Sequence, residues 1–275
     1  MEISSNTVLC GVILHPAGHT RSPAMQNAAY AELGIDAVYL AFDVPPESLS
    51  AAFSGARALG VRQLSISIPH KEAALRLVDE IDDTAERIGA INTAVLREGR
   101  WFGTNTDWLG AVQALERETS LEGLRGVVLG AGGTARAVVH GLSSRGMKVQ
   151  ILNRTPARAE RLAQEMGAEA AGPLEALSGL AYDVLVNTTS VGLESDESPV
   201  DPGALRRDSV VLDAVYQPER TRLLRDAQAR GARTVPGKWM LVYQAAEQLR
   251  SWSGQPPPLE TMARAFDQAR ATQAG

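Results

Sequence analysis

The segment Gly126–Thr155, GVVLGAGGTARAVVHGLSSRGMKVQILNRT, has the pattern of a strand, a glycine turn, a helix and a second strand. Its apolar start, Val127 to Leu129, is typical of a buried parallel strand. A G-x-G-x-x-A turn follows, in which the first glycine permits a tight bend and the second lets the backbone approach a pyrophosphate. Anions bind well at the start of such a helix. The turn residues expected to contact a dinucleotide are Gly130, Ala131, Gly132, Gly133, Thr134 and Ala135.

The residues after the second strand, Val149–Leu152, indicate which dinucleotide binds. An NAD site usually has an Asp or Glu here for the ribose hydroxyls, whereas this chain has Asn153, Arg154 and Thr155. A guanidinium suits a 2′-phosphate, so Arg154 favours NADP. Arg158, about one helical turn later, is a second candidate for that phosphate. The alternative is a glycine turn with a solvated arginine and no nucleotide, which the complete strand-turn-helix-strand context disfavours.

Composition narrows the class of protein. A length of 275 residues allows two domains or one large one, and a formal net charge of −5 argues against a nucleic acid or an anionic membrane as partner. Cys10 is the single cysteine and lies in an apolar run, which fits a reducing compartment. No apolar segment approaches the roughly 18 residues that span a bilayer, and the N-terminus lacks the pattern of a signal peptide. We therefore expect a cytoplasmic protein.

The four histidines do not predict a metal site. None of His15, His19, His70 and His140 forms a short His-x-x-x-His pair or has the carboxylate spacing of a zinc site. We expect metal-free chemistry.

Apolar runs alternate with helical patterns along the whole chain, which predicts an α/β fold. Strands are expected at 8–14, 37–42 and 61–68 before the glycine turn, and at 183–186, 210–212 and 233–235 after it. Ser22 followed by Pro23 predicts a helix start with Ser22 as the N-cap. About a hundred residues thus precede the nucleotide domain, and two lobes imply a ligand cleft between them. The two helical patterns at the end of the chain, 239–252 and 258–271, could pack on either lobe.

Polar residues gather where the first lobe's strands end. Ser65 and Ser67 share one face of the strand that ends before Lys71, and a ligand is one explanation for a polar face on a buried strand. Two further clusters of Gly, Asn and Thr residues, at 89–93 and 103–107, flank a predicted hairpin at 94–101. Asp107 has a simple alternative as the N-cap of the next helix.

Together these segments resemble the shikimate dehydrogenase family over nearly the whole chain. In the first lobe, the family's His-Ser-x-Ser-Pro corresponds to HTRSP at 19–23, its Asn-x-Thr-x-Pro-x-Lys to SISIPHK at 65–71, and its Gly-Ala-x-Asn-Thr and Gly-x-Asn-Thr-Asp to 89–93 and 103–107. In the second lobe the matches are GAGGTARA at 130–137, NRT at 153–155, NTTSVG at 187–192, DAVYQP at 213–218 with Thr221, and GKWMLVYQ at 237–244.

The resemblance implies an NADP-dependent oxidation of shikimate to 3-dehydroshikimate, a reversible step of aromatic amino acid biosynthesis. It implies two α/β domains, a substrate domain at 1–107 plus 238–275 and a Rossmann-type NADP domain at 108–237. The family's catalytic Lys and Asp correspond to Lys71 and Asp107, of which Lys71 is the expected acid/base. The implied shikimate contacts are Thr20, Ser22, Ser67, Asn92, Tyr216 and Gln244. Further implied cofactor contacts are Thr188, Ser190, Val215 and Gly237.

Two departures from the family pattern concern the substrate. Ser65 replaces an Asn beside the ring, and Thr20 replaces a Ser beside the carboxylate, which adds a methyl group. A methyl group in a tight pocket changes discrimination by about 1–3 kcal/mol. Alternatives are therefore a paralogue that prefers quinate and, from another class, a non-catalytic NADP-binding sensor. The sequence leaves the oligomeric state open, with a homodimer as one option.

Overall fold

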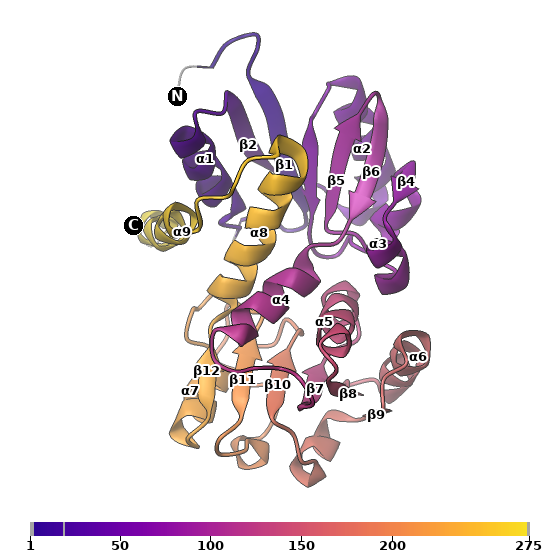
Figure 1. The fold of residues 1–275 in the computed structure, drawn as a ribbon, viewed down its shortest axis with the longest axis vertical. Helices are drawn as coiled ribbons and strands as arrows, with labels where there is room; N and C mark the ends of the chain where they lie inside the picture. Colours follow the sequence, from indigo (N-terminus) through magenta and orange to yellow (C-terminus); the bar gives the residue numbers. More distant parts are fainter. Residues whose placement is uncertain (1–2, 19, 274–275) are drawn as a thin grey trace. The chain divides into compact units, whose positions relative to one another are not determined.

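The computed structural model describes residues 3–18 and 20–273 and contains two compact units (Figure 1). Unit 1 comprises the residues up to Thr106 together with those from Gln244 onward, and unit 2 comprises Asp107–Tyr243. Each unit contains one sheet covered by helices. No helix among the described residues is both long and apolar enough to cross a membrane.

The sheet of unit 1 has the strand order β2-β1-β3-β5-β6-β4 in the described residues. Strands β1, β2 and β3 are parallel, and β5 turns back antiparallel to β3. The strands are β1 Val8–Leu14, β2 Ala37–Asp43, β3 Gln63–Ile66, β4 Glu80–Ile81, β5 Thr93–Arg97 and β6 Arg100–Thr104. The helices are α1 Ser22–Leu33, α2 Leu49–Ala58, α3 Asp83–Ile88, α9 Leu259–Gln273 and the second half of α8 Gly237–Ser253, with short 3₁₀ turns at Pro46–Ser48 and Ala73–Arg76.

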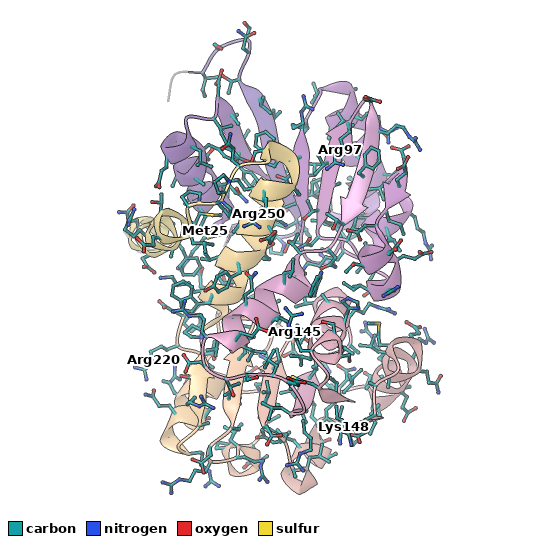
Figure 2. All side chains as sticks on the ribbon, viewed as in Figure 1. Met25, Arg97, Arg145, Lys148, Arg220 and Arg250 are labelled. Carbon is teal, nitrogen blue, oxygen red and sulfur yellow. The ribbon has the colours of Figure 1, made fainter. Side chains whose placement is uncertain are left out.

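The two faces of the unit 1 sheet differ in chemistry at β3. Leu64 and Ile66 belong to the apolar core that also contains Phe53 of α2. Because successive side chains of a strand alternate in direction, Gln63 and Ser65 point to the other face, where α8 packs. There, the guanidinium of Arg97, labelled in Figure 2, donates to the main-chain oxygen of Ser251 near the end of α8 (3.2 Å).

The sheet of unit 2 has the strand order β12-β11-β10-β7-β8-β9, all parallel in the described residues. Read from β9, this is the 3-2-1-4-5-6 order of Rossmann domains. The strands are β7 Arg125–Leu129, β8 Lys148–Leu152, β9 Ala170–Gly172, β10 Val184–Asn187, β11 Val210–Asp213 and β12 Arg233–Val235. The helices are α4 Asp107–Glu116, α5 Gly133–Ser144, α6 Pro156–Met166, α7 Arg222–Ala229 and the first half of α8, with 3₁₀ turns at Leu174–Gly179 and Pro202–Ala204.

Both faces of the unit 2 sheet are buried, which explains why its strands are continuous apolar runs. Val128 packs in one core with Ala135 and Val138 of α5. Its neighbours Val127 and Leu129 pack in the other core with residues of α7. The fold class expected from the sequence, two α/β domains with the second of Rossmann type, is confirmed.

Two local predictions differ from the structure. Ser22 is the first residue of α1 and not its N-cap: Arg21 precedes the helix, and no side chain caps it. Strand β3 ends at Ile66, two residues before the predicted end. The chain there bends into Ile68-Pro69, and proline has no N–H for a sheet.

Candidate functional site

The glycine turn of unit 2 lies at the carboxyl end of the central strand β7. Beside it, β10 begins the other half of the sheet, so this is the point where the strand order reverses and where such sheets bind ligands. Gly130 has φ 112°, and a Cβ there would lie 2.5 Å from Oγ1 of Thr188. No other residue fits this position without strain. A Cβ at Gly132, by contrast, would meet nothing within 4 Å, so the turn leaves room before α5 for a phosphate.

Predicted cofactor residues also follow β10, β11 and β12 at this carboxyl edge of the sheet. Thr188, directly after β10, donates from both its N–H (2.9 Å) and its hydroxyl (2.6 Å) to the main-chain oxygen of Leu129. Gly237, at the start of α8, stands close to Val215, because a Cβ there would lie 2.7 Å from the Val215 oxygen. Ser190 follows in the same turn as Thr188.

The predicted phosphate contacts lie beyond the neighbouring strand β8. The N–H of Gly130 donates to the oxygen of Leu152, the last residue of β8 (2.8 Å), so the segment that follows β8 begins beside the glycine turn. The Asn153 amide donates to the oxygen of Thr155 (3.0 Å) and shapes that segment. Arg154 and Arg158 are both exposed. The local fold therefore leaves two guanidinium groups available to a phosphate near the turn.

A buried carboxylate supports the two loops that follow β10 and β11. Asp213 accepts hydrogen bonds from the Asn187 amide (2.8 Å), the N–H of Val215 (3.0 Å) and the hydroxyl of Thr221 (2.6 Å). The Thr221 hydroxyl also caps α7 by accepting from Leu224 N–H. Burial raises the pKa of Asp213 to about 6, against these hydrogen bonds, which lower it.

Asp213→Asn is expected to change how stability depends on pH. The folded state holds the Asp213 proton more tightly than the unfolded state does. Protonated Asp213 therefore stabilises the folded state fully below about pH 4, and this stabilisation is lost as the pH rises through about 6. The free energy of unfolding of the wild type relative to the variant should fall by about 3 kcal/mol over this range. Urea unfolding from pH 4 to 7 measures it, with exposed Glu169→Gln as the control. Parallel curves for wild type and variant would contradict the prediction.

In unit 1, two predicted substrate residues from distant parts of the chain meet. The Asn92 side chain donates to Oε1 of Gln244 (3.2 Å) and to the Thr106 hydroxyl (2.9 Å), and its oxygen accepts from the N–H of Thr106 (2.8 Å). The Thr106 hydroxyl donates to the main-chain oxygen of Gln244 (3.0 Å). All three residues are buried. This cluster of Asn92, Thr106 and Gln244 fixes two amide side chains in defined orientations.

The other predicted residues of unit 1 lie on segments that hydrogen bonds hold in place. The main-chain oxygen of Lys71 accepts from Ile91 N–H (3.0 Å), next to Asn92. Ser67 N–H donates to the Ile13 oxygen at the end of β1 (2.9 Å). The Thr20 hydroxyl is 3.4 Å from the N–H of Ser22. His19, which the family motif also includes, lies outside the described residues.

Two predicted residues, Asp107 and Tyr216, belong to unit 2. Asp107 is the first residue of α4, is buried, and follows Thr106 directly. Tyr216 is half-buried in the loop after β11, next to Val215. Among the described residues, no group of three or more His, Cys, Asp and Glu side chains is placed to hold a metal ion.

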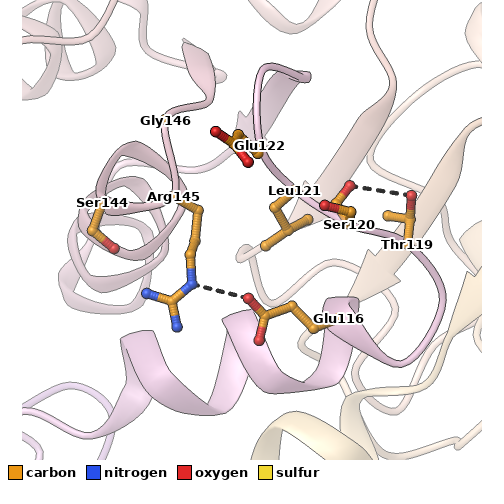
Figure 3. Close-up of a pocket in the computed structure, with 8 residues that line it drawn as sticks. All are labelled: Glu116, Thr119, Ser120, Leu121, Glu122, Ser144, Arg145 and Gly146. Atoms are coloured by element: carbon orange, nitrogen blue, oxygen red, sulfur yellow. Dashed lines mark hydrogen bonds and ion pairs between the residues drawn. The ribbon is translucent and has the colours of Figure 1, made fainter.

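A surface groove of unit 2 lies at the opposite edge of the sheet (Figure 3). It has a volume of about 740 Å³, and the Arg145–Glu116 ion pair (2.9 Å) crosses it. Its residues Leu121 and Gly146 precede β7 and β8, whereas ligands of open parallel sheets bind beyond the carboxyl ends of the strands. The groove is therefore not the dinucleotide site.

Three family models match successive parts of the chain. Residues 12–94 match the family model of the shikimate dehydrogenase substrate binding domain, residues 113–194 that of shikimate / quinate 5-dehydrogenase, and residues 237–265 that of the shikimate 5'-dehydrogenase C-terminal domain. The chain belongs to the shikimate dehydrogenase family. A curated member, the shikimate dehydrogenase (NADP(+)) of Thermococcus kodakarensis, is 48% identical over 92% of this chain and 93% of its own.

Solved structures of the family have the same fold. Shikimate 5-dehydrogenase of Thermus thermophilus, in complex with NADP(H) and shikimate, is 40% identical with a TM-score of 0.89 and covers 95% of this chain and 99% of its own. Quinate dehydrogenase of Corynebacterium glutamicum, in complex with NAD, is 31% identical with a TM-score of 0.86 and covers 95% and 99%. The family thus includes members named for either acid, so the residues around the substrate need their own test.

Several residues of these sites were missed by reasoning from the sequence. Thr106 contacts the side-chain amide of Asn92 and the main-chain oxygen of Gln244, and Gln248, on α8, donates to the main-chain oxygen of Asn92 (3.0 Å). Asp213 supports the loops that follow β10 and β11 through its hydrogen bonds to Asn187 and Val215, whereas the sequence identified it only as part of a family motif. Gln248 follows Gln244 by four residues and so shares its helix face, which is the signal that could have found it.

Proposed function

We propose that this chain is an NADP-dependent shikimate dehydrogenase, which interconverts shikimate and 3-dehydroshikimate in aromatic amino acid biosynthesis. The observation that carries the proposal is the buried contact between Asn92 and Gln244, beside the segment that carries Lys71. A site that recognises several ring hydroxyls needs oriented donors and acceptors, because groups left unpaired by a wrong substrate discriminate strongly. Membership of the family and the Rossmann unit support the same activity.

The catalytic roles go to Lys71 and Asp107. Oxidation of the alcohol requires loss of the hydroxyl proton as the hydride leaves, so an acid/base group must contact that oxygen. Lys71 suits this task because an amine on a long side chain can donate a proton to the oxygen and accept one from it, and Asp107 would orient both the amine and a ring hydroxyl. The main chain of Lys71 is hydrogen-bonded to Ile91, which precedes Asn92 of the buried cluster, and Asp107 follows Thr106 of that cluster in the sequence.

The remaining substrate contacts divide by chemistry. The hydroxyls of Thr20, Ser22 and Tyr216 would bind the carboxylate of shikimate, and the Ser67 hydroxyl with the Asn92 and Gln244 amides would bind the ring hydroxyls. The hydrogen bond from the Ser22 N–H to the Thr20 hydroxyl, which keeps these two residues together, supports the first assignment. Apart from Tyr216, which belongs to unit 2, these residues belong to the proposed substrate domain at 1–107 plus 238–275.

The cofactor is NADP, which the Rossmann domain at 108–237 would hold and which would supply the hydride acceptor for shikimate oxidation. The glycine turn from Gly130 to Ala135 would bind the pyrophosphate, and the segment with Asn153, Arg154, Thr155 and Arg158 would bind the 2′-phosphate. Thr188, Ser190, Val215 and Gly237 would surround the nicotinamide half. The open space at Gly132 and the exposure of Arg154 support these assignments.

Comparing kcat/KM for shikimate and quinate, each with NADP⁺ and NAD⁺, tests the function. Shikimate with NADP⁺ should exceed every other combination by about tenfold or more, since loss of a paired polar contact costs at least that much. NADP⁺ binding without turnover of either acid would instead identify a sensor. Faster quinate oxidation would identify the quinate paralogue. Both outcomes would contradict the proposal.

We also propose that the protein works in the cytoplasm. Cys10 is fully buried, and burial raises the pKa of its thiol to about 12, which suits a core thiol that stays reduced. Fractionation of the native host, with NADP-dependent shikimate oxidation as the readout, tests the location. Activity confined to a membrane or secreted fraction would contradict it.

A further inference from the structure

Ser65 has all of its hydrogen-bonding capacity taken by protein groups. Its hydroxyl accepts from the Tyr39 phenol (2.6 Å) and from the Gln63 side chain (3.1 Å), and it donates to Oε1 of Gln248 (2.7 Å). A hydroxyl offers one donor and two lone pairs, so these three partners fill it. The polar face of β3 is thus explained by partners on β2, β3 and α8, and Ser65 is not available to a ligand.

Gln248 uses both ends of its buried amide on this side of the sheet. Its Oε1 accepts from Ser65, and its Nε2 donates to the main-chain oxygen of Asn92 (3.0 Å). That oxygen also accepts from Ile66 N–H (2.7 Å). Only 2% of Gln248 is exposed, so water cannot replace either partner. Removing one partner would leave a buried polar group unsatisfied.

Two glutamines of one helix therefore hold Asn92 from the same side. Gln244 and Gln248 are four residues apart on α8, which puts them on one helix face. Gln248 binds the main chain of Asn92, and Gln244 accepts from its side chain (3.2 Å). The position of α8 against β3 sets the distance between the Asn92 and Gln244 amides.

We propose that Gln248 is a positioning residue for shikimate recognition, which acts through Ser65 and the Asn92 main chain to orient the Asn92 and Gln244 amides. The inference rests on the proposed function, which assigns those two amides to the ring hydroxyls. Gln248 itself does not contact substrate. Its loss lets α8 and the Asn92 segment shift, and a displacement of about 1 Å in the groups that bind the ring hydroxyls lowers kcat/KM for shikimate severely.

Three variants test this positioning role of Gln248: Gln248→Met, Ser65→Ala and the double substitution. Gln248→Met keeps the side-chain volume and helix propensity while removing both hydrogen bonds. We expect kcat/KM for shikimate to fall about tenfold or more, mainly through KM, because recognition contacts are misplaced. KM for NADP⁺ should stay within about twofold. The double variant should lose no more than Gln248→Met alone, because both residues act through one contact.

Gln26→Met is the matched control. Gln26 is 1% exposed on α1, and its amide donates to the main-chain oxygen of Ala245 on the same helix as Gln248 (3.0 Å). The substitution thus removes an equally buried hydrogen bond to α8 that does not reach Asn92. Urea unfolding should show that both variants fold, with Gln248→Met the more destabilised because it loses two hydrogen bonds and Gln26→Met loses one. Only Gln248→Met should change kcat/KM for shikimate.

The outcomes separate the two proposals. If the wild type oxidises shikimate and Gln26→Met lowers kcat/KM as much as Gln248→Met, the role of Gln248 is structural and the inference is wrong. Losses that multiply in the double variant would also overturn it. If the wild type does not oxidise shikimate, the proposed function fails together with the inference. Should Gln248→Met not fold, Ser65→Ala, which removes a single oxygen, must by itself lower kcat/KM by about threefold.

Discussion

Lys71→Ala is expected to lower kcat for shikimate oxidation by about a hundred- to ten-thousandfold, the range attributed to a positioned acid/base group. The proton of the reacting hydroxyl then has no partner on the protein, whereas the cofactor contacts of unit 2 are untouched. Steady-state kinetics with NADP⁺ measure the loss of kcat, and isothermal titration measures NADP⁺ affinity, which should stay within about twofold.

Lys148→Ala is the control for this substitution. Lys148 is an exposed lysine at the start of β8, labelled in Figure 2, and its loss should leave kcat unchanged. Turnover by Lys71→Ala at the wild-type rate would remove Lys71 from the mechanism. The same experiment with Asp107→Asn would then show whether Asp107 carries the proton transfer.

Arg154→Asp should reverse or abolish the preference for NADP⁺ over NAD⁺. The substitution removes a charge-assisted hydrogen bond to the 2′-phosphate and adds a like charge beside it. Each effect is worth about 1.5–3 kcal/mol, so the ratio of kcat/KM for the two cofactors should fall by about a hundredfold or more. Affinity for NAD⁺ should change little, because NAD⁺ has a hydroxyl at that position.

The matched control is Arg161→Asp, which makes the same charge change at an exposed position further along α6. It separates a local contact from a general effect of charge on an anionic cofactor, which salt would screen. If both variants shift the ratio equally, Arg154 does not contact the phosphate. If neither does, another residue selects the cofactor.

Much of the fold follows from local patterns. The strands predicted at 8–14 and 233–235 have the bounds that the structure has, because each is a short segment between polar or turn residues. The Rossmann unit follows from the glycine turn, whose tight bend at Gly130 only glycine allows. Boundaries are less predictable, as at Ser22, where the helix begins one residue earlier than the capping pattern indicates.

The substrate side is less predictable from the sequence because its contacts are between distant residues. Ser65 meets Tyr39 and Gln248, which lie 26 and 183 positions away, and no local pattern connects them. A polar strand face therefore suggests a ligand where the structure has protein partners. Asn92 and Gln244 can be paired only through the resemblance to the family, since 152 positions separate them.

The filled hydroxyl of Ser65 also constrains how this protein can evolve. An amide side chain at position 65 would enter a space where the phenol of Tyr39 and the side chains of Gln63 and Gln248 already converge. Such a change is tolerated only if one of those neighbours changes with it, because interiors are close-packed and buried polar groups need partners. Substitutions at positions 39, 65 and 248 should therefore be correlated among relatives.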